Sequence, residues 1–167
     1  MSLMKLSNQR LDSHLKSLVS SEREILKEIL IHIAEADRRR LYLDFGYPSL
    51  FAYLTKSIGY AEGSAQRRID AARLSSEAPD VIEKLESGEL NLAQVSLLQK
   101  IIREVQGTSK SKIKSELKSE LVEQLSNKSF TESQILVSEA FNITSKESTK
   151  TTHQKDESVH SAGVCFG

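Results

Sequence analysis

The chain has 167 residues and carries 23 basic and 23 acidic side chains, so its formal net charge is zero. This balance excludes a uniformly basic nucleic-acid-binding surface but leaves room for a local basic face. Aromatic residues make up only 5% of the chain, which also has just two prolines and seven glycines. So few turn-forming and aromatic residues argue against a barrel or a sandwich, and they predict an all-α fold with several helices.

A long first helix is predicted over residues 21–43, after a lead-in at 1–20 that is partly helical. Ser20 or Ser21 is expected to cap this helix, because a serine hydroxyl accepts a hydrogen bond from the first free backbone amides. Apolar residues recur along the helix at helical spacing, and Gly46 follows it as a stop. These apolar residues are Ile25, Leu26, Ile29, Leu30 and Ile33.

A helical hairpin is predicted next, over residues 49–75, with Gly59 in its turn. A short helix, a glycine-containing turn and a second helix are the pattern of a helix-turn-helix. The pattern has one fault, because the inward position nine residues after Gly59 is Arg68, and the apolar Ile69 comes one residue late. The hairpin is therefore either a helix-turn-helix with a longer turn or a plain pair of helices. Its two helices are expected over 49–57 and 62–75.

The second hairpin helix is predicted to have a small apolar back and a polar front. If Ile69 faces inward, a rotation of about 100° per residue puts Ala65 and Ala72 on the same side and Arg67 almost opposite. Serine, glutamine and arginine side chains on the front are those that reach phosphates and base edges in a major groove. The outer half and its flanks carry Ser64, Gln66, Arg67, Arg68, Ala71 and Arg73.

Four more helices are predicted after the hairpin. Asn91 is expected to cap the second of them, and Gly107 to end it. Thr131 and Gln134 have the spacing of a capping box at the start of the last helix. The four helices are expected over 79–85, 92–105, about 113–125, and 131–143.

The composition changes at Thr144. The first eighteen residues from there contain a single aliphatic residue, Val159. Such a segment cannot bury enough apolar surface to offset the entropy of ordering it, so residues 144–167 are predicted to be a disordered tail. The domain organisation expected is thus a lead-in at 1–20, a helical domain at 21–143 and this tail.

Basic residues gather around the hairpin. The segment from 38 to 73 has seven basic and three acidic residues, a net charge of +4 in a neutral chain. A basic face of this kind binds phosphates, so duplex DNA is the predicted partner. The candidate DNA-binding residues are Arg38, Arg39, Arg40, Lys56, Ser64, Gln66, Arg67, Arg68 and Arg73.

The arginines at 38–40 also have a simpler interpretation. Cations are favoured in the last turn of a helix, where they interact with the negative end of the helix dipole. At least one of the three is expected to pair with Glu35, Asp37 or Asp44. The phosphate-binding interpretation rests on their being contiguous and close to the hairpin in sequence.

Patterns for catalysis, metal binding or cofactor binding are not found in the sequence. Of the four histidines, at 14, 32, 153 and 160, only the last two are close in sequence, and a single pair seven residues apart in the predicted tail is a weak metal signal; Cys165 is the only cysteine. One cysteine permits neither an intrachain disulfide nor a cysteine-based zinc site, which indicates a reducing compartment. No apolar run is long enough for a signal peptide or a membrane span, so a cytoplasmic location is expected, with no cofactor and no metal.

Residues 18–74 are similar to the N-terminal region of a family of bacterial HNH endonucleases that is abundant in Bdellovibrio-like bacteria. The similarity covers roughly residues 11–139. Its most specific parts are ERE, RRRLY, GY-x-SL-x-x-Y, GY-x-x-x-x-A-x-RRI-x-A-x-RL and P-x-x-x-x-x-L-x-x-GEL-x-L. The segment at 59–98 also resembles, more weakly, the helix-turn-helix core of ParB-type proteins, in which a DNA-reading helix precedes a G-x-L-x-x-x-x-A helix.

The chain departs from that family at its catalytic module. In the family the nuclease lies C-terminal to this region and uses histidines and an asparagine around a divalent metal. None of those residues can be matched to a position in this sequence. The resemblance thus implies the helical accessory part of a nuclease, without the nuclease, and a chain that is not itself an enzyme.

Three functions follow as hypotheses. The first is DNA binding through the hairpin at 49–75, as a nuclease-associated module. The second is a helical protein-interaction module, for example one that forms a homodimer through the first long helix. The third is a non-catalytic subunit of a nuclease, in which another chain supplies the metal site. An exposed basic surface over the hairpin arginines favours the first, and burial of those arginines against acidic partners favours a structural role.

Overall fold

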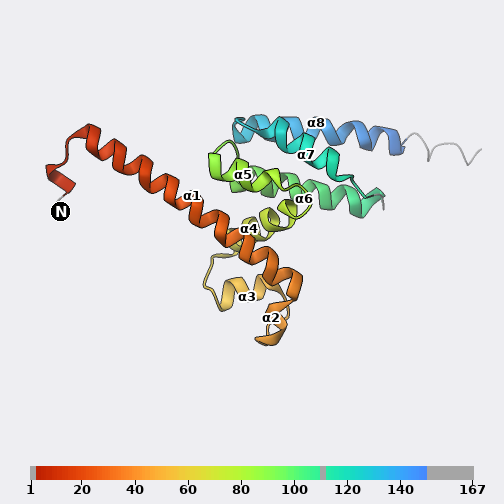
Figure 1. Cartoon of the computed structure of the whole chain (residues 1–167). Coiled ribbons are helices and arrows are strands. Elements are labelled where there is room, and N and C mark those ends of the chain that lie inside the picture. Colours follow the sequence, from red (N-terminus) through yellow and green to blue (C-terminus); the bar gives the residue numbers. More distant parts are fainter. Residues whose placement is uncertain (1–2, 110–111, 150–167) are drawn as a thin grey trace, which may run out of the picture.

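The computed structural model describes residues 3–109 and 112–149, and within these ranges every regular element is a helix. The all-α fold class is thereby confirmed (Figure 1). None of the helices in the described ranges combines the length and the apolar character that crossing a bilayer requires. The elements are η1 (Leu3–Lys5), α1 (Asn8–Arg39), α2 (Leu41–Asp44), α3 (Leu50–Lys56), α4 (Glu62–Ser75), α5 (Asp80–Ser87), α6 (Leu92–Ser109), α7 (Ser115–Leu125) and α8 (Phe130–Thr149).

The helices are arranged around α4. It packs against α1, α3, α5 and α6, and α6 in turn packs against α8. Figure 1 shows α1 as a long rod whose N-terminal part leaves the body, with α2 and α3 at its other end and α5 to α8 grouped above. Of the two hairpin helices, α4 thus lies at the junction between α1 and the C-terminal helices.

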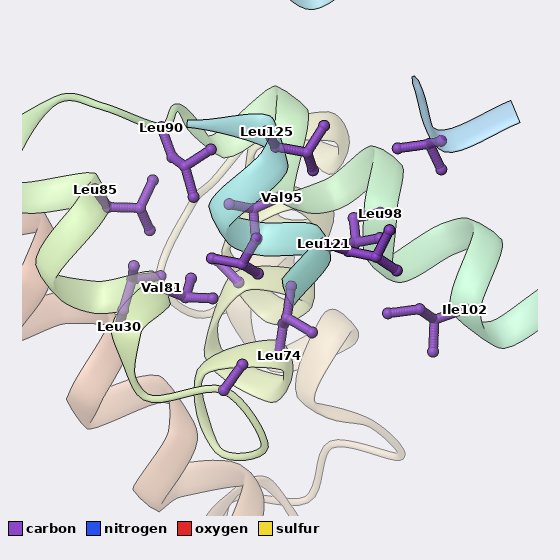
Figure 2. Close-up of a cluster of buried hydrophobic side chains, with 14 residues drawn as sticks. Leu30, Leu74, Val81, Leu85, Leu90, Val95, Leu98, Ile102, Leu121 and Leu125 are labelled. Carbon is purple, nitrogen blue, oxygen red and sulfur yellow. The ribbon is translucent and has the colours of Figure 1, made fainter. Parts of the chain in front are cut away.

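Two clusters of buried side chains hold this arrangement together. The larger cluster joins α4 to α5, α6, α7 and α8 and includes Leu30 of α1 (Figure 2). The smaller cluster joins the C-terminal half of α1 to α3 and α4. Its buried members are Ile33, Leu50, Leu54, Ala65, Ile69 and Ala72. The prediction that Ala65, Ile69 and Ala72 form the inward face of α4 is therefore confirmed.

The first long helix begins earlier than predicted. It starts at Asn8, where the hydroxyl of Ser7 accepts a hydrogen bond from the backbone N–H of Arg10 at 3.3 Å. The serine pair at 20–21 lies inside the helix, so the prediction of a cap there was wrong. Nothing between residues 8 and 20 stops a helix, since that stretch lacks proline and glycine.

The same helix also ends earlier than predicted. Arg40 adopts a left-handed backbone, with φ of 54°, and its N–H donates to the carbonyls of Ala36 and Asp37. This is a helix C-cap of the left-handed type, made here by a residue other than glycine. The cap separates α1 from the four-residue helix α2, which the sequence had joined to it.

The hairpin helices lie where they were predicted, at Leu50–Lys56 and Glu62–Ser75. Ser49 caps the first, accepting a hydrogen bond from the N–H of Ala52 at 3.0 Å. Gly59 in the turn has φ of 87°, a conformation that residues with a side chain rarely adopt. That the pair acts as a helix-turn-helix stays a prediction.

The C-terminal helices differ from prediction at three positions. Gly107 lies within α6, which continues to Ser109, because an exposed glycine weakens a helix without ending it. The capping box of α8 is formed by Ser129 and Glu132, two residues earlier than Thr131 and Gln134. The helix α8 runs on to Thr149, past the predicted start of the tail, and the rest of that tail, 150–167, lies outside the described residues.

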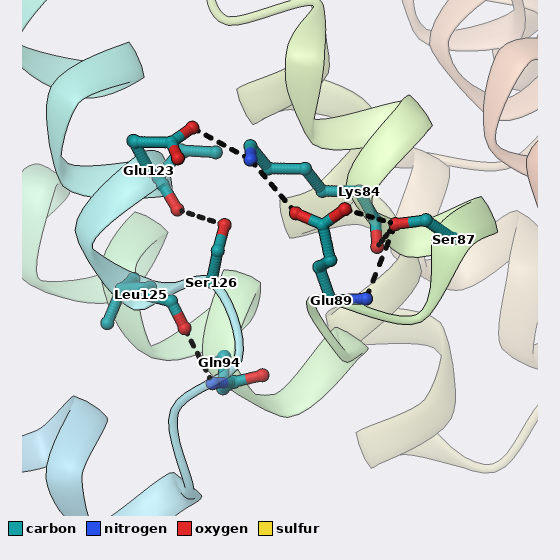
Figure 3. Close-up of polar contacts among 8 residues, drawn as sticks. Lys84, Ser87, Glu89, Gln94, Glu123, Leu125 and Ser126 are labelled. Carbon is teal, nitrogen blue, oxygen red and sulfur yellow. Dashed lines mark hydrogen bonds and ion pairs between the residues drawn. The ribbon is translucent and has the colours of Figure 1, made fainter.

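Polar side chains lock the C-terminal helices together. Asn91 caps α6 as predicted, and its own N–H donates to the side-chain oxygen of Gln94 at 3.0 Å. The buried amide nitrogen of Gln94 donates to the carbonyls of Leu125 and Lys128 and to the hydroxyl of Ser133. Figure 3 shows the Gln94–Leu125 contact beside a second link, in which Lys84 lies between Glu89 and Glu123 at 3.2 and 2.8 Å.

Candidate nucleic-acid interface

Arg67 is the exposed arginine of the second hairpin helix. It lies on the side of α4 that faces away from the buried Ala65, Ile69 and Ala72, as predicted. Its guanidinium makes no hydrogen bond or ion pair with any residue in the described parts of the chain. This side chain is therefore available to an anion in solution.

Arg68 is held in place by its own neighbours. Its guanidinium lies over the ring of Tyr60, 4.5 Å from the ring centre, and donates to the carbonyl and hydroxyl oxygens of Ser64 at 3.2 and 3.1 Å. Its Nε is buried and has no hydrogen-bond partner among the described atoms. Both Ser64 and Arg68 are thus engaged in holding the start of α4 against the hairpin turn.

The polar front predicted for α4 is not free, and this part of the prediction was wrong. Ala71 has 0% and Asp70 1% of its surface exposed, because α6 covers that side of the helix. The amide of Gln66 donates to the carboxylate of Asp70 at 2.9 Å instead of facing solvent. The same carboxylate accepts from Ser96 at 2.6 Å and pairs with Arg103 at 3.0 Å, both on α6. A helix covered in this way cannot lie in a major groove with that face toward the bases.

Arg73, at the end of α4, is paired across to α1. Its guanidinium donates to both carboxylate oxygens of Asp37, at 2.7 and 3.3 Å. The hydrogen bond to Asp37 raises the pKa of Arg73 above its ordinary value. This contact brings together the C-terminal ends of α1 and α4, which are 36 residues apart in the sequence.

Arg38 and Arg39 share a carboxylate one turn back along α1. Arg38 makes two hydrogen bonds to Glu35, each 2.6 Å long, and Arg39 makes one of 2.5 Å. Hydrogen bonds from Arg38 and then from Arg39 lower the pKa of Glu35 to about 2. The prediction that at least one of the arginines at 38–40 pairs with a nearby acidic residue is therefore confirmed, with Glu35 as the partner.

Arg40 differs from the other arginines of this cluster. Its side chain is exposed and has no hydrogen bond or ion pair to any described residue. It lines a cavity of about 380 Å³ together with Arg38 and Arg73. The structure thus brings three of the nine candidate residues, from two helix ends, to one concave surface.

The cavity also contains groups that the sequence did not single out. Tyr42 and Ser76 line it and carry hydroxyls, and Asp37 lies there as the partner of Arg73. Guanidinium groups hold phosphate and carboxylate oxygens through paired N–H donors, and the hydroxyl of Tyr42 adds a further donor, whereas that of Ser76 already donates to the carbonyl of Ala72. The arrangement can therefore hold an anionic group such as a phosphate, with Asp37 as the competing native anion.

The other candidates lie outside this cavity. Lys56 is exposed in the last turn of α3 and has no partner among the described residues. Ser64, Gln66, Arg67 and Arg68 belong to the opposite end of α4, and Arg39 stays with Glu35. The nine residues consequently form one small cluster of three and several separate contacts, and they do not form a single continuous surface.

Within the described residues, no three histidine, cysteine, aspartate or glutamate side chains are grouped closely enough to hold a metal ion. His32, one of two histidines in this range, is exposed and its Nδ1 lies 2.6 Å from the carbonyl of Glu28. No protein-family model matches the chain, and no curated protein or solved structure is significantly similar to it. The resemblance to HNH endonucleases accordingly stays a prediction based on its sequence motifs.

Proposed function

We propose that this chain is a cytoplasmic DNA-binding module of the HNH endonuclease type that contacts the phosphates of a duplex and does not read its bases. The observation that supports this proposal is the cavity between the ends of α1 and α4, where Arg38, Arg40 and Arg73 converge. Arg40 reaches it without an acidic partner among the described residues. Contacts of arginine with phosphates supply most of the affinity of non-specific DNA binding.

Each arginine has a distinct part in the proposed contact. Arg40 is the free cation and offers its whole guanidinium to a phosphate. Arg73 has Asp37 as a partner already, so a phosphate has to share it. Arg67 lies six residues before Arg73, about 9 Å from it along the axis of α4, and supplies a second contact. Base readout is left out of the proposal because α6 covers the polar side of α4.

The acidic residues around the cavity limit the affinity. Glu35 and Asp37 hold Arg38, Arg39 and Arg73 in ion pairs of 2.5 to 2.7 Å. A phosphate competes with these carboxylates, so the binding is expected to be weak. Non-specific complexes of this kind have dissociation constants of about 10⁻⁴ to 10⁻⁶ M at physiological salt.

The central test is binding of a fluorescent random-sequence duplex over a series of salt concentrations. Arg40→Asn removes the free charge and keeps a residue that tolerates the left-handed backbone. Losing one phosphate contact should weaken binding and lower the slope of log K against log salt by about one. Lys100→Gln is the matched control, because Lys100 is an exposed cation on α6 away from the cavity. Equal losses in the two variants, or no binding by folded protein at low salt, would contradict the proposal.

Glu35→Gln gives a test of opposite sign. The substitution releases Arg38 and Arg39 from their shared carboxylate, so two more guanidinium groups become available. Binding should tighten and the salt slope should become steeper. Weaker binding in this variant would mean that Glu35 positions the arginines for contact and does not compete with the phosphate.

Arg67 and Ile69 separate the surface of α4 from its core. Arg67→Ala should weaken DNA binding and leave the free energy of unfolding nearly unchanged, because Arg67 is exposed. Ile69→Ala should cost about 2–5 kcal/mol of stability through the cavity that it leaves. Its effect on binding should disappear once binding is expressed per folded molecule. If Arg67→Ala unfolds the protein and spares binding, the exposed side of α4 has a structural role.

The chain alone is expected not to cleave DNA. Its sequence offers no set of histidines and an asparagine from which the metal site of an HNH nuclease can be assembled. The assay is incubation of purified protein with plasmid in magnesium, manganese or zinc. Metal-dependent cleavage that is lost when His14 or His32 is changed would contradict this expectation.

A further inference from the structure

The N-terminal half of α1 has no partner in the described fold. Every residue from Asn8 to Glu22 is exposed, and Arg23 is the first that is partly covered. Figure 1 shows this arm extending away from the other helices. Isolated helices of about 15 residues are marginal in water, so an arm of this length needs a partner to stay helical.

The arm carries an apolar seam with the spacing of a coiled coil. Positions along it alternate by four and three residues, which is the seven-residue repeat that lines up one face of paired helices. Leu11, Leu15, Leu18 and Ile25 are between 38% and 66% exposed, although side chains of this kind are usually buried. Six of the eight seam positions are apolar and two, Glu22 and His32, are polar; the full set is Leu11, Leu15, Leu18, Glu22, Ile25, Ile29, His32 and Ala36.

The seam runs from the free arm into a hollowed apolar surface on the packed half of α1. A cavity of about 600 Å³ lies on one side of Ile25 and Ile29, with Tyr53 and Ile58 of the hairpin in its wall. A second cavity of about 620 Å³ borders the same two isoleucines and includes Leu85 and Leu90. The exposed ridge of α1 thus continues between two hollows, whose other walls come from the hairpin and from α5 with its following loop.

Side chains of opposite charge lie beside the two ends of the seam. Arg10 lies on the free arm, and Glu24 and Glu28 lie at the edge of the groove. Arg10 and Glu28 are about five full turns apart, so they lie on the same flank of α1. The side chains of Arg10 and Glu24 have no hydrogen bond or ion pair to other described residues.

We infer that two copies of this chain associate through α1 in antiparallel orientation, with the arm of each lying in the groove of the other. A two-fold axis near residue 20 sets Leu11 beside Ile29 and Leu15 beside Ile25 of the second copy. It also brings Arg10 of each copy to the flank that carries Glu28 of the other. Such an interface uses the same surface twice, as two-fold symmetric dimers do.

A second copy fits this surface better than an unrelated protein, because the chain itself carries both the apolar ridge and the surface that receives it. The ridge continues with the same seven-residue period into the floor of the groove, where Ile25 and Ile29 lie, while the walls of the groove come from the hairpin and from α5 with its following loop. The cation and the carboxylates are exchanged by the same two-fold rotation that places the ridge in the groove. An overlap from residue 11 to residue 29 is about 28 Å long, enough for several layers of paired side chains.

The first experiment measures the mass of the full chain in solution by sedimentation velocity over a range of protein concentrations, without DNA. The wild-type protein should pass from monomer to dimer as the concentration rises. The double variant Leu15→Glu, Leu18→Glu should remain a monomer. Its core should still fold, because Leu15 and Leu18 are both exposed and lie outside the two buried clusters, and a near-unchanged thermal midpoint at low concentration verifies this.

Ile31→Glu is the matched control for this experiment. Ile31 is 45% exposed on the same helix, but it lies about 160° from the seam at Ile29. This variant should dimerise like the wild type. A wild-type protein that stays monomeric at every concentration would overturn the inference. An equal loss of association in the control would overturn it as well.

Charge reversal tests the antiparallel orientation. Arg10→Glu and Glu28→Arg should each weaken dimerisation about two- to fivefold, as expected for exposed ion pairs. The double variant should restore it, because the exchanged charges then face each other again. In a parallel pair these residues lie far apart and no rescue occurs, so additive losses would overturn the antiparallel arrangement. Because no DNA is present, this test is independent of the proposed DNA binding.

Discussion

The helices α1 and α4 both carry inward-facing apolar residues at helical spacing but differ in how much of their surface is covered. Half of α1 is exposed on all sides, whereas α4 is enclosed by α1, α3, α5 and α6. The period of a sequence tells which residues share a face of a helix. How many faces are covered depends on the neighbouring helices, and the period alone does not contain that information.

The enclosure of α4 depends on small side chains and on one satisfied carboxylate. Ala71 and Ala72 let α6 and α1 approach closely, because alanine leaves room for a neighbouring helix. Asp70 can be buried because Gln66, Ser96 and Arg103 all contact its oxygens. From the sequence alone an aspartate such as Asp70 is expected at the surface, because it is charged. In the fold its three partners allow it to be buried.

The largest expected effect compares the two halves of α1 directly. Leu30 is fully buried in the packed half and Leu18 is exposed in the free arm. Leu30→Ala should lower the free energy of unfolding by about 3–4 kcal/mol, within the range for buried leucines. Leu18→Ala should change it by less than about 0.5 kcal/mol in dilute solution. Urea unfolding at low protein concentration measures both, and similar losses in the two variants would show that the arm packs on the body.

The next effect tests the covered side of α4. Asp70→Ala removes a buried carboxylate and leaves the half-buried Gln66 and Ser96 without their acceptor, which should cost about 3 kcal/mol. Arg67→Ala, three residues earlier on the exposed side, serves as its control and should cost less than about 0.5 kcal/mol. If Asp70→Ala is as mild as its control, α6 does not cover this side of the helix as tightly as the contacts indicate.

A smaller effect concerns the end of α1. Arg40 holds a left-handed backbone that costs a residue with a side chain roughly 1 kcal/mol. Arg40→Gly should relieve this strain and raise the free energy of unfolding by up to about 1 kcal/mol, while Arg40→Ala should not. Thermal unfolding of the two variants side by side measures the difference. Destabilisation by glycine would mean that the arginine side chain itself supports the helix end.

The smallest effect is the pH dependence that Glu35 introduces. Its pKa in the folded protein is about 2, below the usual 4.5, because Arg38 and Arg39 hydrogen-bond to the charged form. The unfolded state therefore takes up the proton first as the pH falls. The stabilisation is present above pH 4.5 and is lost between there and pH 2. Unfolding midpoints measured across this window should fall less steeply in Glu35→Gln than in the wild type.

Much of the fold was predictable because it depends on local chemistry. Gly59 sets the hairpin turn, Asn91 caps α6, and the spacing of Ala65 and Ile69 marks the inward face of α4. The start of α1 was not predictable in this way. The serines at 20–21 have the chemistry of a cap but lie where nothing interrupts the helix. Ser7 has the same chemistry and is the cap.

The candidate site was less predictable than the fold. The arginines could be named from composition and position, and the exposure of Arg67 followed from helical geometry. The cavity could not be predicted from the sequence, because it forms only where the ends of α1 and α4 meet, through the contact of Asp37 with Arg73. Tyr42 and Ser76 enter it for the same reason, and neither has a pattern around it that distinguishes it from the other hydroxyl residues of the sequence.

The buried amide of Gln94 has a consequence for how the molecule opens. It connects the first turn of α6 to the end of α7 and to the first turn of α8 through hydrogen bonds to Leu125, Lys128 and Ser133. None of these three helices can detach without leaving buried polar atoms unsatisfied, so they should unfold together as one cooperative unit. In hydrogen exchange, the amides of α6, α7 and the start of α8 should share one opening free energy, whereas those of residues 8–22 should exchange far faster in the monomer.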